Sequence, residues 1–354
     1  MEDNKRILGL DLSRCAAISL VLGAHYCGPL HDLGFFGVEL FFALSGYLIG
    51  GILIRMFFQE CPPDLAGVFN FWQRRWWRTV PNYILFFLLM LLFHSIEEGI
   101  GGVPHGVAAL SYLVFCQNMV NTGQFFFGVS WSLCVEEWFY FIFPILMLFL
   151  TKLKMNSSHA LIAVLVLLPL ISAGFRTHFL LYGHNLESVR MLTMGRLDAI
   201  SHGVFLSVSV RYSTPTISGR RWLAMTGLLL LSASVALYLK TSHGIITANL
   251  SLMLPSLGFA CLLPWCEKLN MVKIPAVLCA AIQKLSLWSY SIYLCHIPIL
   301  YLVYDAAGDS RRNILINFAC RPVAGAFTIA FSAFVYRFFE SKMTRLRPRE
   351  SVRA

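Results

Sequence analysis

Long apolar runs recur along the whole chain. They are continuous rather than alternating, as in LFFALSGYLIGGILI and LLPLISAGF. A helix of about 20 apolar residues crosses the hydrocarbon core of a bilayer, whereas strands of a membrane barrel alternate polar and apolar positions over about ten residues. The pattern therefore predicts an all-α fold, a polytopic transmembrane helix bundle.

Hydropathy places about ten spans along the chain. They lie near residues 7–26, 34–54, 80–96, 133–150, 160–175, 191–210, 222–239, 245–265, 286–304 and 315–336. Residues 103–120 are ambiguous. If this segment crossed the bilayer, the later basic loops would all face outward, against the positive-inside rule. We therefore expect a re-entrant or interfacial segment that lines a cavity, with both chain termini in the cytoplasm.

Composition supports a lipid environment, because 57% of the 354 residues are hydrophobic and only 13% are charged. No repeat or linker is visible, so we predict one domain over residues 1–340 and a basic cytoplasmic tail over residues 341–354. The net charge of +10 does not indicate nucleic-acid binding, since the basic residues lie at span ends and in KMTRLRPRESVRA. The scattered cysteines lack metal-ligand spacing, so no metal is expected.

Three ionisable residues share the first span, where a charge is costly in lipid and indicates a function by default. Asp11, Arg14 and His25 fall on one helix face. Arg14 is expected in the inner half of the membrane, and His25 about 16 Å further along the axis. The alternative is that Asp11 and Arg14 pair only to lower the cost of insertion, while His25 lies in the interface.

Charged residues also occur inside later spans. Glu39 lies in GFFGVELFFALSGYLIGG, where the glycines allow close helix approach. We interpret Glu39 either as a packing hydrogen-bond partner or as a residue that supports the site. Arg196 and Asp198, in MGRLDAISHG, are expected to pair with each other or with the charged pair of the first span.

The segment FNFWQRRWWRTVPNY interleaves Arg74, Arg75 and Arg78 with tryptophans at the cytoplasmic border. Tryptophan and arginine commonly anchor a protein at the interface. Alternatively, the guanidinium groups bind phosphates and the indoles stack on a purine. The spacing of these residues, taken alone, favours an interfacial anchor over a phosphate-binding site.

Two further segments carry groups suited to proton transfer. Glu136 and Glu137 open the helix of VSWSLCVEEWFYFIFP, and adjacent helical residues point about 100° apart, so at most one of them faces a site. Tyr293 and His296 share a face in LSLWSYSIYLCHIPI and form a hydrogen-bonding set. Interfacial tyrosine and histidine are also commonplace.

In order along the chain, these motifs resemble the acyltransferase-3 family of integral membrane acyltransferases. Arg14 and His25 match its pattern of arginine, ten residues and histidine; GFFGVELFFALSGYLI matches its second helix, and RRWWRTVP the basic motif of the following loop. WSLCVEEWFYFIFP, GRLDA and SYSIYLCHIP match later blocks, so the resemblance covers nearly the whole chain. Trp138 departs from a frequent glutamine, and YRFFESK lacks the usual proline.

The resemblance implies transfer of an acyl group, usually acetyl from acetyl-CoA, to a hydroxyl of a sugar, a cell-surface glycan or a lipid-linked acceptor. Within that hypothesis, His25 is the general base, Glu136 holds its ring, and Arg14 stabilises negative charge or grips the donor. The arginines of RRWWRTVP would bind the CoA phosphates. The acyl group either crosses the bundle on the pantetheine arm or passes through a covalent relay.

The same residues would also suit a protein with a different class of function. Buried Asp11, Arg14, His25, Glu39 and Asp198 would also suit a proton-coupled transporter or a flippase. The motif order favours the acyltransferase. We further expect membrane lipids around the bundle and a prokaryotic plasma membrane as its location, whereas the sequence does not indicate an oligomeric state.

Overall fold

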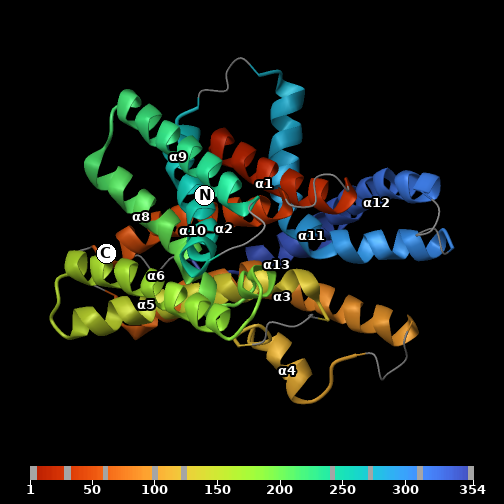
Figure 1. The fold of residues 1–354 in the computed structure, drawn as a ribbon, viewed down its shortest axis with the longest axis horizontal. Helices are drawn as coiled ribbons and strands as arrows, with labels where there is room; N and C mark the ends of the chain where they lie inside the picture. The colour runs from red at the N-terminus through yellow and green to blue at the C-terminus, as the bar shows by residue number, and fades with distance from the viewer. Residues whose placement is uncertain are drawn as a thin grey trace.

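The computed structural model describes residues 6–27, 33–58, 63–97, 103–120, 126–239, 244–269, 274–308 and 314–349. Over these ranges the chain contains helices and no strand, which confirms the all-α prediction. The long helices are α1 (Leu8–Tyr26), α2 (Leu33–Phe57), α3 (Leu65–Glu97), α5 (Trp131–Lys152), α6 (Ser157–Leu181), α8 (Leu197–Ser213), α9 (Ile217–Tyr238), α10 (Ile245–Glu267), α11 (Ala276–Ala306) and α12 (Ile314–Val335) (Figure 1).

Within the described ranges, nine helices are long and apolar enough to cross a membrane. The remaining long helix, α8, has 17 residues and packs closely on α2 in the middle of the bundle. Shorter elements are α4 (Val107–Leu113), α7 (Leu186–Val189), α13 (Ser341–Arg345), 3₁₀ turns at Gly128–Ser130 and Met194–Arg196, and a π-helical turn at Tyr336–Glu340.

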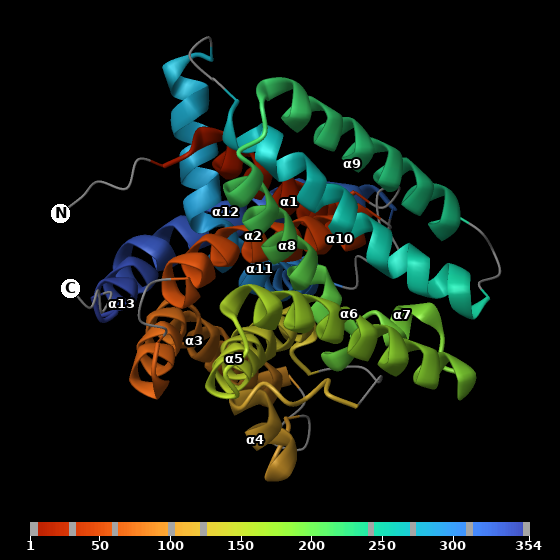
Figure 2. The ribbon, with the colours of Figure 1, turned by 90° about the vertical axis from the view of Figure 1, so that its left-hand side faces the viewer.

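The ambiguous segment 103–120 does not cross the bundle. Its only helix is α4, with 7 residues, and α4 lies at the periphery of the long helices (Figures 1 and 2). Asn118 ties the segment to the bundle, since its side chain donates to the Met191 carbonyl at 2.6 Å. The structure has a cavity lined by six arginines, among them Arg14, Arg75 and Arg78, and residues 103–120 do not contribute to its wall, so the expectation of a cavity-lining segment is not met there.

The basic segment around Arg75 is helical, not a loop. Helix α3 starts at Leu65, well before the span expected from residue 80, so RRWWRTVP is a part of that helix. Hydropathy missed this part of α3 because arginines lower the mean hydropathy of the sequence window. The helix itself continues beyond the apolar run that hydropathy detects.

Glycines let α2 and α8 touch through their backbones. A Cβ placed on Gly46 would lie 2.0 Å from the Ile200 carbonyl oxygen, and one on Gly203 would lie 2.2 Å from the Ala43 oxygen. Both separations are far shorter than a van der Waals contact, so only glycine fits. The close approach expected of the second-span glycines is confirmed.

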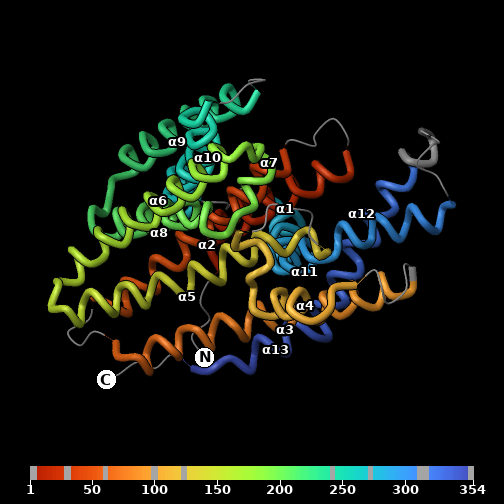
Figure 3. The backbone as a smooth tube through the Cα atoms, turned by 60° about the horizontal axis from the view of Figure 1, so that its bottom comes forward, coloured from red at the N-terminus to blue at the C-terminus, as the bar shows by residue number. Residues whose placement is uncertain are grey.

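The bundle has two sides around a cavity. Helices α1, α2, α8 and α10 pack together, while α3, α5 and α13 lie together away from α9 (Figure 2). Helix α13 runs beside α3 (Figure 3). The cavity lies between α1, α2 and α11 on one side and α3, α5 and residues 336–347 on the other.

Candidate active site

A cavity of about 770 Å³ lies among these helices. Ligand pockets commonly measure about 300–1,000 Å³, so the cavity is large enough for a cofactor-sized molecule. Arginines outnumber carboxyl groups six to three in its wall: Arg6, Arg14, Arg75, Arg78, Arg345 and Arg347 against Asp11, Glu136 and Glu340. Its surface is therefore suited to an anion that carries several charges.

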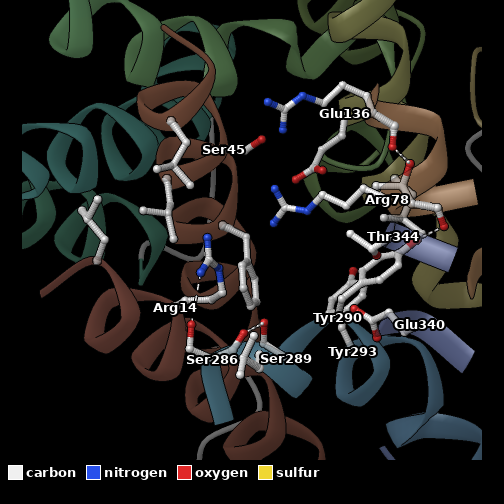
Figure 4. A pocket seen from close by; sticks show the side chains of 18 of the residues that line it. Arg14, Ser45, Arg78, Glu136, Ser286, Ser289, Tyr290, Tyr293, Glu340 and Thr344 are labelled. Carbon is white, nitrogen blue, oxygen red and sulfur yellow. Dashed lines mark hydrogen bonds between the residues drawn. The ribbon is translucent and has the colours of Figure 1, made fainter. Parts of the chain in front are cut away.

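Asp11 organises one wall. Its carboxylate is only 4% exposed and accepts hydrogen bonds from Arg6 at 2.6 Å and from the Ser286 hydroxyl at 2.7 Å. Arg14 lies 3.4 Å from Asp11 and donates to the Ser286 oxygen at 3.1 Å (Figure 4). Asp11 and Arg14 do form a pair, as the alternative interpretation expected, but Arg6 is the closer partner. Ser286 comes from α11, and nothing in the sequence pattern indicated it.

The opposite wall carries Arg75 and Arg78 of α3 and Glu136 of α5. Arg78 and Glu136 point into the same space as Arg14 (Figure 4). The Arg75 guanidinium lies 6.0 Å from the centre of the Tyr140 ring, and the Tyr140 hydroxyl donates to Glu136 at 3.3 Å. Tyr140 therefore connects an arginine and a carboxylate of the predicted site.

The other predicted residues of RRWWRTVP and WSLCVEEWFYFIFP lie on helix faces that point away from the cavity. Arg74 does not contribute to the cavity wall, and the indoles of Trp76 and Trp77 are exposed on the outside of the bundle. Glu137 also turns away from the cavity and accepts from the Thr79 hydroxyl at 2.6 Å. As expected, only one of the two adjacent glutamates faces the cavity.

His25 lies away from the cavity wall, against a second histidine. Its Nδ1 lies 2.9 Å from the Val21 carbonyl oxygen, and its ring centre lies 4.8 Å from that of His296, edge to face. Glu136 is in the cavity wall and bonds Tyr140, so the structure does not bring it to the His25 ring. A carbonyl only accepts, so Nδ1 carries the proton and Nε2 is the basic nitrogen of neutral His25.

Tyr293 and His296 connect the cavity with His25. The Tyr293 side chain forms part of the cavity wall, and its hydroxyl lies 2.7 Å from that of Ser132. Its ring lies 5.8 Å from that of His296, which in turn contacts His25. The His296 Nδ1 donates to the Tyr293 carbonyl at 2.7 Å, while its buried Nε2 has no hydrogen-bond partner in the described part of the chain. The two residues thus share a face as predicted, and they stand between cavity and His25.

The other predicted charges form buried ion pairs outside the cavity. Arg196 pairs with Glu39, and Asp198 pairs with Arg176 at 2.6 Å, with all four side chains at most 1% exposed. The expected pairing of Arg196 with Asp198, or with the charges of the first span, is wrong. The 3₁₀ turn Met194–Arg196 and the first turn of α8 place these residues toward α2 and α6, an arrangement that sequence spacing does not indicate. Arg176 was missed because it falls at the edge of an apolar run.

No group of three or more histidine, cysteine, aspartate or glutamate side chains in the described ranges is arranged to hold a metal ion. The arginine-lined cavity has a volume and a lining that suit a cofactor, and its chemistry favours phosphate groups.

Comparison with known proteins identifies the family. The profile of the acyltransferase-3 type, described as an acyltransferase domain, matches residues 7–337. The O-acetyltransferase OatA of Staphylococcus aureus (strain NCTC 8325 / PS 47) is 32% identical over 176 residues, which are 47% of this chain and 28% of that protein. No solved structure matches this chain.

Two further relatives carry related names. The peptidoglycan O-acetyltransferase OatA of Listeria monocytogenes is 29% identical over 186 residues, 49% of this chain and 29% of that protein. The putative peptidoglycan O-acetyltransferase YrhL of Bacillus subtilis is 32% identical over 184 residues, 49% of this chain and 28% of that protein. The aligned parts thus cover less than a third of each of these relatives. With its membrane-spanning helices and a family match across nearly its whole length, this chain is an integral membrane protein that belongs to the acyltransferase-3 family.

Proposed function

We propose that the protein is a membrane O-acetyltransferase, which takes an acetyl group from acetyl-CoA in the cavity and transfers it to a hydroxyl of a sugar, glycan or lipid-linked acceptor. The observation that carries the proposal is the arginine-lined cavity, whose wall leads through Tyr293 and His296 to His25. The relatives named as peptidoglycan O-acetyltransferases favour a cell-surface glycan as acceptor.

The donor is bound by charge. CoA carries a diphosphate and a 3′-phosphate, and guanidinium forks form strong, charge-assisted hydrogen bonds with such groups. Arg75 and Arg78 face the cavity from one helix, and Arg14 faces it from another. Arginine-rich ends of membrane helices favour the cytoplasmic side, where acetyl-CoA is present, and both termini would lie on that side of a prokaryotic plasma membrane.

His25 acts as the general base. Its Nε2 takes the proton of the acceptor hydroxyl, the oxygen attacks the thioester carbonyl, and the C–S bond breaks as the imidazolium returns its proton to the CoA thiolate. The Val21 carbonyl holds the required tautomer through Nδ1, the role first expected of Glu136. Arg14 is about 16 Å from His25 along α1, so gripping the donor suits it better than stabilising the oxyanion.

Two routes connect the donor with His25. Either the pantetheine arm extends from the arginines past Tyr293, or a covalent acyl relay carries the group across the wall. The same cavity would admit either route. A transporter or flippase has no support from the family match or from the relatives.

Turnover of acetyl-CoA by purified protein in detergent, with and without a glycan acceptor, tests the proposal. We expect His25→Ala to abolish acetyl transfer while keeping CoA binding, and Arg75→Ala to weaken CoA binding. Arg55→Ala is the matched control, because this exposed arginine on α2 does not contribute to the cavity wall. Failure of the native protein to bind CoA would overturn the donor assignment.

A further inference from the structure

The C-terminal segment forms the mouth of the cavity. Ser341, Thr344 and Arg345, at or near α13, and Arg347 just after it all contribute to the cavity wall. The family match ends at residue 337, so this part of the wall lies beyond the family domain. It also lies within the stretch that the sequence alone indicated only as a basic tail.

The segment is fixed at both of its ends. At its start, the Glu340 carboxylate is 9% exposed and accepts from the Ser291 hydroxyl of α11 at 2.5 Å and from the Asn82 amide of α3 at 3.1 Å. Near its end, the Asn70 side-chain amide donates to the Arg349 carbonyl at 3.3 Å. Helix α13 is thus held beside α3 (Figure 3), where its residues form part of the cavity wall.

Exposure differs among the arginines of the cavity. Arg14 and Arg75 are only partly exposed, whereas Arg345 and Arg347, like Arg6 and Arg78, are exposed to solvent. A bound acyl-CoA must direct its thioester inward toward His25, since the transfer takes place there. The nucleotide end of the molecule therefore lies at the mouth, beside the C-terminal arginines.

We propose that Arg345 and Arg347 bind the 3′-phosphate of CoA, so that the C-terminal segment makes the protein prefer CoA over dephospho-CoA. This inference rests on the proposed function, because it assumes an acyl-CoA donor. Arg75 and Arg78, which line the cavity from α3, then take the diphosphate, which both compounds share. The preference is a property of residues beyond the family domain and can differ between members that share the bundle.

The same phosphate chemistry is present in anionic lipid headgroups, which a basic segment next to a membrane also attracts. The two sources are separated by comparing nanodiscs of zwitterionic lipid alone with nanodiscs that contain an anionic lipid. In zwitterionic nanodiscs, only the added nucleotide supplies the phosphate monoester that is under test.

The experiment measures dissociation constants of CoA and dephospho-CoA for the full-length protein and for Arg345→Ala, Arg347→Ala and the double variant. Lys342→Ala is the matched control, because it removes a positive charge from α13 at a position outside the cavity wall. In zwitterionic nanodiscs, we expect the double variant to bind CoA about tenfold more weakly, a loss of about 1.4 kcal/mol, and dephospho-CoA as the native protein does. The control should bind both as the native protein does.

The outcomes are distinct. An unchanged CoA preference in the double variant overturns the role of the C-terminal arginines and leaves the proposed function standing. An effect seen only with anionic lipid assigns these arginines to headgroups and also overturns the inference. A native protein that binds neither compound overturns the proposed function together with it. Elution as a single species in size-exclusion chromatography checks that each variant is folded.

Discussion

The buried pair of Glu39 and Arg196 should dominate the stability of the region where α2 meets α8. Both side chains are fully buried, and the guanidinium Nε and Nη1 have no hydrogen-bond partner within the described ranges. Glu39→Gln keeps the shape of the side chain and removes its charge, which leaves the Arg196 charge without its nearest counter-ion. Removing one partner of a buried pair costs about 3–5 kcal/mol, and the neighbouring Asp198 favours the lower end of that range.

This loss of free energy corresponds to a measurable shift in Tm. With an unfolding entropy of about 2.1 cal/mol/K per residue over 354 residues, a loss of about 3 kcal/mol lowers Tm by about 4 °C. Thermal unfolding in detergent, followed by tryptophan fluorescence, measures it. Glu187→Gln is the matched control, because Glu187 pairs with Arg190 at 2.7 Å but is 51% exposed, and a surface pair contributes about 1 kcal/mol at most.

A double replacement sharpens the test. Glu39→Leu combined with Arg196→Met removes both charges and should restore most of the lost stability, since apolar side chains of similar volume often replace a buried pair without cost. Glu39→Gln with a native Tm, or a double variant less stable than Glu39→Gln alone, would refute the electrostatic reasoning.

Three further outcomes follow from the geometry. His296→Gln should leave CoA binding intact and slow acetyl transfer by about 10²-fold or more, measured under saturating donor, because it alters the contact with His25 rather than the cavity; equal losses in binding and transfer would contradict this. Arg78→Ala should weaken CoA binding about tenfold and Arg74→Ala much less, since only Arg78 reaches the cavity wall, and isothermal titration compares them. Gly46→Val should prevent recovery of folded protein in size-exclusion chromatography, because its Cβ would meet a backbone oxygen at 2.0 Å; normal yield would contradict the close packing of the two helices.

Much of the bundle is predictable from sequence because a membrane helix is specified by a local run of apolar residues. The first span was expected at residues 7–26 and is observed at Leu8–Tyr26. The close contact of α2 with α8 was also predictable, because it depends on glycines such as Gly46 within the sequence of a single helix. The predicted helix boundaries are wrong where charged residues flank the apolar run, as in α3. Hydropathy detects the segment that lies in the hydrocarbon core rather than the whole helix.

The partners of the buried charged residues were harder to predict, because they depend on which helices are neighbours. Residue type correctly marked Glu39, Arg196 and Asp198 as buried charges needing partners. Their actual pairing required knowing that α8 lies between α2 and α6, and it involves Arg176, which falls one residue beyond the expected span 160–175. Similarly, no pattern within one helix indicates that a serine of α11 binds Asp11.

The hydrogen bonds of the two histidines determine how their rings would respond to a movement between α1 and α11. His25 donates to a carbonyl of α1, and His296 donates to a carbonyl of α11, so each imidazole is oriented by its own helix. A motion that parts α1 from α11 would carry both rings away from each other with their tautomers intact. Under the proposed function, acetyl transfer would then stop because the two rings are separated, and it would resume when the helices close, with both Nδ1 protons still in place.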